Sequence, residues 1–365
     1  MSRIKKYCLE FYLNARDYPM VKKYVSVGDL SNRKYKTNSW LILLLALNYS
    51  SSVWANNLPS AEELSQRLGI TEQNLVNLNK GDIVYFDVAE GDEKELAAGV
   101  AIYLPAKPAK VMGVIKSKNL LSIDGEITSE GTIPTQATVE AFKGFGFKSG
   151  NEEAANFLAA QPGSEFNLST EEFRTLHSIA SAQSDSASQV YRNILLQRWQ
   201  AYQKNGLKGI ATYDRGNGAE ASPGGELRFA TQDSKILTSY FPELYQAWLN
   251  YPVALPNGTE ETYIWRNRQV EGRPTAILVH RIIYSAQTGE LILSRQFYAG
   301  HSYNSNQLVI ACLPYLGGSL VFYANRTFTD QVAGFGSGLK HSIGQKQAKS
   351  EISKLLKNLH SILKK

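Results

Sequence analysis

The last third of the chain most constrains the fold, because its apolar pattern changes from helical to alternating after Pro252. Five successive segments have the two-residue period of β-strands, and short links join them. Consecutive strands with short connections pair as an antiparallel meander. The five predicted strands are Thr262–Gln269, Thr275–Ser285, Leu291–Gly300, Gln307–Leu313 and Ser319–Asn325.

One long amphipathic helix is predicted after the meander, over Leu339–Lys364. Its apolar stripe includes Ile352, Leu356 and Leu359, and lysines occupy the opposite side. Such a stripe must be buried, and the concave face of the meander is its natural partner. The predicted fold class is therefore α+β, with a curved antiparallel sheet gripping a long C-terminal helix.

The remainder of the chain divides into shorter regions. Residues 56–81 carry the capping signals of two helices, with Ser60 and Thr71 as N-caps. Residues 82–116 contain two strand-like segments and a short helix. Residues 117–250 have mainly helical patterning and are predicted to form a helical insertion, before the meander and helix of residues 251–365.

Two segments resemble the START-like superfamily, the helix-grip fold of polyketide cyclases and lipid-transfer domains. Residues 98–115 look like its opening strand, proline-containing turn and first helix. Residues 318–326, leading into Gly338-Leu-Lys-His341, look like its last strand and closing helix. More narrowly, residues 295–303 and 323–326 are similar to a family of exported bacterial proteins of unknown function. The resemblance implies a cavity between sheet and helix, and hence an apolar or lipid-like ligand.

An export signal is predicted near the N-terminus. Basic residues precede the apolar run Trp40–Asn48, and Ser-Ser-Val-Trp-Ala follows it, which indicates cleavage after Ala55. The run is shorter than the roughly 20 residues of a membrane span. An uncleaved anchor and a buried helix are the alternatives, and Met20 is an alternative start. Residues 1–55 are thus predicted to be a signal peptide of a periplasmic or secreted protein.

The net charge of +6 for the whole chain does not describe the folded part, because the excess of basic residues lies in the predicted leader. The chain has 39 Lys and Arg against 33 Asp and Glu. Residues 1–55 hold nine of the basic and three of the acidic residues, which leaves 30 of each in the mature part. A nucleic-acid-binding protein needs a positive folded domain, so this class loses support.

Five residues are the candidate ligand contacts: Arg281, Tyr298, His301, Tyr303 and Arg326. Arg281 inside a strand needs an anion or a structural acid. His301 suits ligand binding or general-base catalysis, or is a turn histidine bonded to backbone. Arg326 suits an acidic head group, or a salt bridge to Asp330. The two tyrosines offer a ring and a polar tip, or reflect strand propensity alone.

No cofactor or metal is predicted, because no histidine or cysteine spacing is typical of a metal site. After cleavage Cys312 is the remaining cysteine, and its apolar neighbours predict a buried, inert thiol. The lysine-rich face of Leu339–Lys364 suggests a peripheral contact with anionic lipid, or a solvated face.

Three functions remain open at this stage. The first is an exported protein that binds a hydrophobic small molecule or lipid in a helix-grip cavity. The second is an enzyme of cyclase or hydrolase type on the same scaffold, with His301 as general base. The third is a cell-envelope interaction protein that uses Asn151–Leu249 as its partner surface.

Overall fold

The computed structural model describes residues 58–116, 123–147, 152–178 and 184–364. All of them belong to one compact unit, residues 54–365. The predicted leader, including the apolar run and the cleavage site after Ala55, lies outside the described residues, so the export signal stays a prediction.

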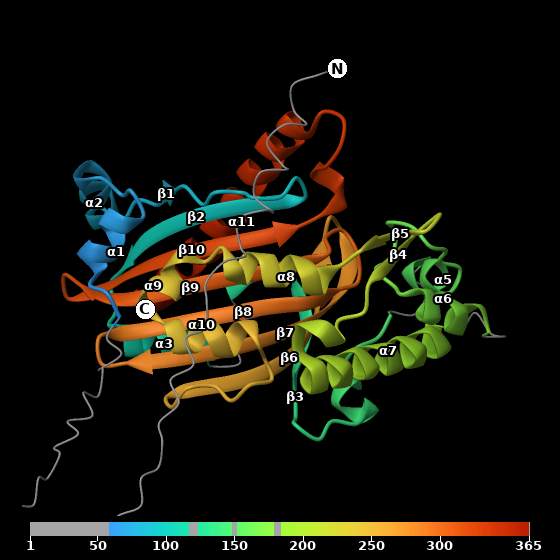
Figure 1. Ribbon diagram of the computed structural model, residues 1–365. Coiled ribbons are helices and arrows are strands. Elements are labelled where there is room, and N and C mark those ends of the chain that lie inside the picture. The colour runs from blue at the N-terminus through green and yellow to red at the C-terminus, as the bar shows by residue number, and fades with distance from the viewer. Residues whose placement is uncertain (1–57, 117–122, 148–151, 179–183, 365) are drawn as a thin grey trace, which may run out of the picture. The chain divides into compact units, whose positions relative to one another are not determined.

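The described residues form one large antiparallel sheet of eight strands, in the order β1-β2-β10-β9-β8-β7-β6-β3 (Figure 1). The predicted meander is confirmed as β6 to β10, since each of these strands pairs with the next along the chain. The strands are β1 Val84–Phe86, β2 Glu95–Leu104, β3 Ile127–Ile133, β6 Thr259–Val270, β7 Arg273–Ala286, β8 Gly289–Ala299, β9 Ser305–Tyr315 and β10 Gly318–Phe328.

The region predicted as a helical insertion contains strands that the pattern did not indicate. β3 pairs with β6 and forms one edge of the sheet, so the insertion begins after Ile133. Only the two terminal isoleucines of β3 are buried, which explains why no apolar alternation marks it. Gly131 permits the pairing, because a Cβ there would meet the Trp265 ring at 2.6 Å. A separate hairpin, β4 Tyr213–Gly216 with β5 Ala219–Ala221, forms a second, two-stranded sheet.

Helices cover both faces of the sheet. One face, called the insertion face, packs against most of the helices, and α8 and α10 lie in front of it in Figure 1. The insertion-face helices are α1 Ala61–Arg67, α2 Glu72–Asn79, η1 Val139–Phe142, α5 Glu152–Leu158, α6 Thr170–His177, α7 Ser184–Asn205, η2 Gly206–Gly209, α8 Pro223–Gln232, α9 Lys235–Tyr240 and α10 Pro242–Leu249. The opposite side, called the α11 face, packs against α3 Pro108–Lys116 and α11 Ser337–Leu363, which follows η3 Asp330–Val332.

The C-terminal helix is buried along half of its length. The predicted apolar stripe is confirmed, because Ile352, Leu356, Leu359 and Leu363 are buried against β2 and β10. Before Ile352 none of the residues of α11 is buried. The molecule is thus α+β, with a large antiparallel sheet and a C-terminal helix.

Candidate functional site

The five predicted contact residues do not converge, because the sheet separates them. Alternation along β7 sends neighbouring side chains to opposite faces. His280 enters the insertion face, where it contacts Tyr202, whereas Arg281 lies on the α11 face near Arg266. Tyr303 belongs with Arg281 on the α11 face. Tyr298 contacts Tyr191 of the insertion, and Arg326 contacts Asp233 of the insertion as well as Glu95 of β2. His301 lies beside the Phe166 ring, but its hydrogen bonds are to residues of the sheet and its loops.

Tyr298 is part of the core that joins the insertion to the sheet. Its hydroxyl lies 3.0 Å from the hydroxyl of Tyr191, and the Arg198 guanidinium lies 4.3 Å from its ring centre. Arg198 in turn donates to Glu172 at 2.5 Å, and both partners are buried. Tyr298 therefore carries a structural contact between α7 and β8.

His301 is a buried, neutral histidine. Its Nε2 lies 2.8 Å from the Thr275 hydroxyl, and its Nδ1 lies 2.8 Å from the Ser302 hydroxyl. Burial, with the charge of Arg273, lowers its pKa to about 4. Among the described residues it has neither an acid nor a tyrosine as hydrogen-bond partner. This geometry disfavours general-base catalysis, which uses an accessible base with an orienting partner.

Arg326 has two structural acids as partners, and neither is Asp330. It donates at 2.5 Å to Glu95, which is fully buried, and at 2.5 Å to Asp233 at the end of α8. Burial raises the pKa of Glu95, although the N–H of Gly91 and the charge of Arg326 oppose the rise. Arg326 is thus held inside the protein and is not directed at a ligand.

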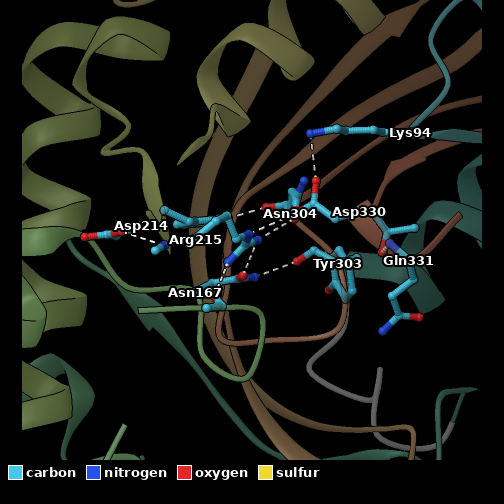
Figure 2. A network of polar contacts seen from close by, with 12 residues as sticks. Lys94, Asn167, Asp214, Arg215, Tyr303, Asn304, Asp330 and Gln331 are labelled. Atoms are coloured by element: carbon cyan, nitrogen blue, oxygen red, sulfur yellow. Dashed lines mark hydrogen bonds and ion pairs between the residues drawn. The ribbon is translucent and has the colours of Figure 1, made fainter. Parts of the chain in front are cut away.

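Asp330 instead belongs to a polar network that ties the insertion to the sheet (Figure 2). Arg215 donates to Asp330 at 2.9 Å and to the side-chain oxygens of Asn167 and Asn304 at 2.8 Å each. Lys94 reaches Asp330 from the other side at 2.8 Å. The network joins β4, the loop before α6, the start of β9 and η3.

Arg215→Met is expected to loosen this junction. The substitution removes four charge-assisted hydrogen bonds from a largely buried guanidinium, including one to the Gly163 carbonyl. We therefore expect a loss of about 2 kcal/mol in unfolding free energy. Hydrogen exchange should quicken in residues 163–168, whose Asn167 loses a partner. Arg215→Lys keeps the charge without the planar fork and should show most of the effect. Unchanged exchange in both variants would contradict the assigned role.

A second buried network on the insertion face was missed at the sequence level. The Tyr202 hydroxyl donates to His280 Nδ1 at 2.7 Å, and Arg295 donates to that hydroxyl at 3.2 Å. His280 Nε2 lies 2.9 Å from Glu261, although not in good hydrogen-bond alignment. Arg295 also donates to the Trp248 carbonyl at 3.0 Å. The available signal in the sequence was Arg295 inside an apolar strand, but the partners of Arg295 lie on helices that are distant in sequence.

The centre of this insertion-face network is closed to solvent, whereas Glu261 at its margin is 36% exposed. His280 and Arg295 have no exposed surface. Burial lowers the pKa of His280 to about 4, against the opposing effect of Glu261. Burial also lowers the pKa of Arg295, which has no carboxylate hydrogen bond among the described residues. A site sealed in this way positions the insertion and offers no access to a substrate.

The α11 face, by contrast, carries a polar patch that is half-buried in the middle of the sheet. We define the α11-face patch as Arg266, Arg268, Arg281, Gln296, Tyr303 and Tyr323, which all retain partial exposure. Arg266 pairs with Glu130 at 3.0 Å, and Arg268 pairs with Asp124 at 2.9 Å. The Tyr303 hydroxyl donates to Gln296 in a short hydrogen bond.

Arg281 is the exception within the α11-face patch. It makes no hydrogen bond or ion pair with any described residue, and its Nε is buried without a partner. Burial, reinforced by the charge of Arg266, lowers the pKa of Arg281 to about 10. The guanidinium is thus partly buried without a hydrogen-bonded carboxylate, although the charges of Glu130 and Glu260 act on it. A cation held in this way is a candidate for a functional role.

The described residues offer no group of three or more His, Cys, Asp or Glu side chains arranged to hold a metal ion. Cys312 is buried as predicted, and burial raises the pKa of its thiol to about 12. None of the helices described is both long and apolar enough to cross a bilayer.

Comparisons with known proteins show no family for this chain. No family model matches the chain, and no curated protein matches it. Among solved structures, TTHA0849 from Thermus thermophilus is 14% identical, with a TM-score of 0.24, over 38% of this chain and 88% of that one. Ara h 8.0201 is also 14% identical, with a TM-score of 0.19, over 39% of this chain and 89% of that one.

Proposed function

We propose that the protein binds a small amphipathic molecule with an anionic group on the α11 face of the sheet, and that Arg281 receives the anion. The observation that carries this proposal is the unpartnered Arg281 guanidinium in the middle of that face. A guanidinium presents a planar fork that matches a carboxylate or phosphate. Such a group would supply a directly bonded counter-charge, whereas Glu130 and Glu260 act on Arg281 without a hydrogen bond or ion pair.

The surroundings of Arg281 fit the apolar part of the same molecule. Ile264, Ile277 and Val279 form a small apolar cluster on this face beside the patch. Ile310 and Tyr323 remain partly exposed although they lie on central strands. The opposite face is sealed by the insertion, so the α11 face is the accessible side. A fatty acid or a similar lipid-like acid has the required combination of chain and head group.

A curved sheet that grips α11 is part of this proposal, and contacts from both sheet edges support it. The Tyr85 hydroxyl of β1 lies 3.0 Å from Ser353, whereas Arg268 of β6 lies 3.5 Å from Glu351. In a flat sheet, six strand spacings would put β1 and β6 about 29 Å apart. Two contacts this near each other on one helix fit a sheet that curls toward it.

The predicted export signal places this binding outside the cytoplasm. The apolar run Trp40–Asn48 and its basic flank are the support for that part of the proposal. A carrier there would keep an amphipathic acid out of water between enzymes or membranes. We do not extend the proposal to catalysis, because His301 has no acid partner among the described residues.

The test compares wild type with Arg281→Met in a titration with a fluorescent fatty acid. Loss of a charge-assisted contact to the anion is expected to weaken binding about tenfold to a hundredfold. Arg174→Met, an exposed change on α6 of the insertion, is the matched control and should bind as wild type does. Native mass spectrometry of purified wild type should show a bound acid. A wild type that takes up no fatty acid, or equal binding by Arg281→Met, would refute the proposal.

The same substitution should make the ligand-free protein more stable. The folded state lowers the pKa of Arg281, so folding opposes its charged form, and a neutral side chain of similar length removes that penalty. We expect Arg281→Met to raise the unfolding free energy by roughly 1–3 kcal/mol. Chemical denaturation measures the change. A less stable variant would show that Arg281 has a structural partner.

A further inference from the structure

The first turns of α11 expose an apolar stripe that the fold leaves uncovered. Phe335, just before the helix, is fully exposed, Leu339 is 70% exposed and Ile343 is 58% exposed. Leu339 and Ile343 lie one turn apart, so they share a side of the helix. Most of the exposed large apolar side chains elsewhere in the described chain stand singly, which is ordinary for a protein surface.

The stripe is held in a fixed direction. His341 lies 2.9 Å from Glu90, and Gln345 donates to the same carboxylate at 2.8 Å, so these two residues mark the side of α11 that meets the protein. A separation of two residues turns the helix by about 200°. Leu339 and Ile343 therefore point away from the rest of the molecule.

Within α11, lysines accompany this stripe and acidic residues do not, although Glu90 contacts the opposite side of the helix. Between Asp330 and Glu351 the chain has Lys340, Lys346 and Lys349 and no aspartate or glutamate. Lys346 is exposed, and Lys349 lies 5.7 Å above the Tyr85 ring. Further along α11, Lys354 and Lys357 are also exposed. A second copy of the chain would bring lysine against lysine here, whereas an anionic surface complements the charge.

We propose that this end of α11 docks on the surface of an anionic lipid membrane. Phe335, Leu339 and Ile343 enter the boundary between head groups and acyl chains, and the lysines pair with lipid phosphates. An amphipathic helix with an apolar edge and a lysine-rich flank is the physical form of a peripheral membrane contact. The inference is independent of ligand binding at Arg281, which lies on the sheet.

The experiment measures sedimentation of the full chain with vesicles of phosphatidylcholine alone, or with roughly a third of phosphatidylglycerol. Wild type should bind the anionic vesicles, and added salt should weaken the binding. Leu339→Ala with Ile343→Ala should weaken it about tenfold or more. Lys346→Ala with Lys349→Ala should also weaken it about tenfold and reduce its salt dependence.

Leu316→Ala is the matched control, because Leu316 is 67% exposed in the turn between β9 and β10, at the opposite end of β10 from the first turns of α11. It should bind as wild type does. Residues 1–57 are common to all variants, so they cannot explain a difference among them. Three results would overturn the proposal: equal affinity for both kinds of vesicle, unchanged affinity in the Leu339 and Ile343 variant, or a dimer in solution that this variant dissociates.

Discussion

Lowering the pH from 6.5 to 4 is expected to remove a large part of the stability of this protein. His280 and His301 are both buried, and burial lowers the pKa of each to about 4. The unfolded chain binds protons at a pKa near 6.5, so between these values it binds more protons than the folded state does. Stability is therefore fully present above about pH 6.5 and falls as the pH drops toward 4.

The expected size of this effect is large. A pKa that falls from 6.5 to about 4 on folding corresponds to about 3 kcal/mol for each histidine, and hence about 6 kcal/mol for the pair. Typical domains have only about 5–15 kcal/mol of unfolding free energy. His341 acts in the opposite direction, because hydrogen bonds to the Glu93 carbonyl and to Glu90 raise its pKa despite burial.

Chemical denaturation at a series of pH values measures the effect. In each single variant, His280→Gln or His301→Gln, the unfolding free energy should depend less on pH between 6.5 and 4, by the contribution of the substituted histidine. The double variant should be less stable at pH 7, because hydrogen bonds are lost, but should depend much less on pH. A wild type whose unfolding free energy is level across this range would show that the two rings are accessible to protons in the folded state.

Arg198→Met is expected to be the most damaging single substitution on the insertion. It leaves Glu172, which is buried, without its main cation, and it removes the guanidinium from the Tyr298 ring. Breaking a buried pair by removing one partner costs about 3–5 kcal/mol, because the remaining charge stays desolvated. The insertion should lose protection first, since Arg198 joins α6, α7 and β8.

The neighbouring pair Arg174 with Glu171 offers a direct control. These side chains are 70% and 80% exposed, so Arg174→Met should change the unfolding free energy by less than about 0.5 kcal/mol. Arg198→Met combined with Glu172→Gln should recover part of the loss, because no unpaired charge remains. Equal effects of the two arginine substitutions would mean that water reaches Glu172 in the folded protein.

Regular elements were predictable from the sequence where one face of the element is uniformly buried. β6 to β10 and α11 are examples. In each of them the side that faces a core carries apolar residues, and these recur at the period of a strand or a helix. α2 begins directly after the predicted N-cap Thr71, because a capping side chain is a local signal. β3 escaped prediction because its stability comes from pairing with β6 and not from an apolar face of its own.

The candidate site was less predictable, because partners decide what a charged residue does. The prediction that Arg281 lies inside a strand could not say which face of the sheet would be closed. Arg326 was paired in expectation with nearby Asp330, yet its acid is Glu95, 231 residues away in sequence. Arg281 is distinguished from Arg326 only by the lack of such a partner among the described residues.

By itself, the sequence determined the fold class, the order of the meander and the buried stripe of the last helix, because each depends on a local period of apolar side chains. The tertiary structure alone decided which face stays accessible, which arginine is left without an acid, and which end of α11 projects with Leu339 and Ile343 exposed. Burial and charge pairing depend on residues brought together from distant parts of the chain, and no local pattern carries that information.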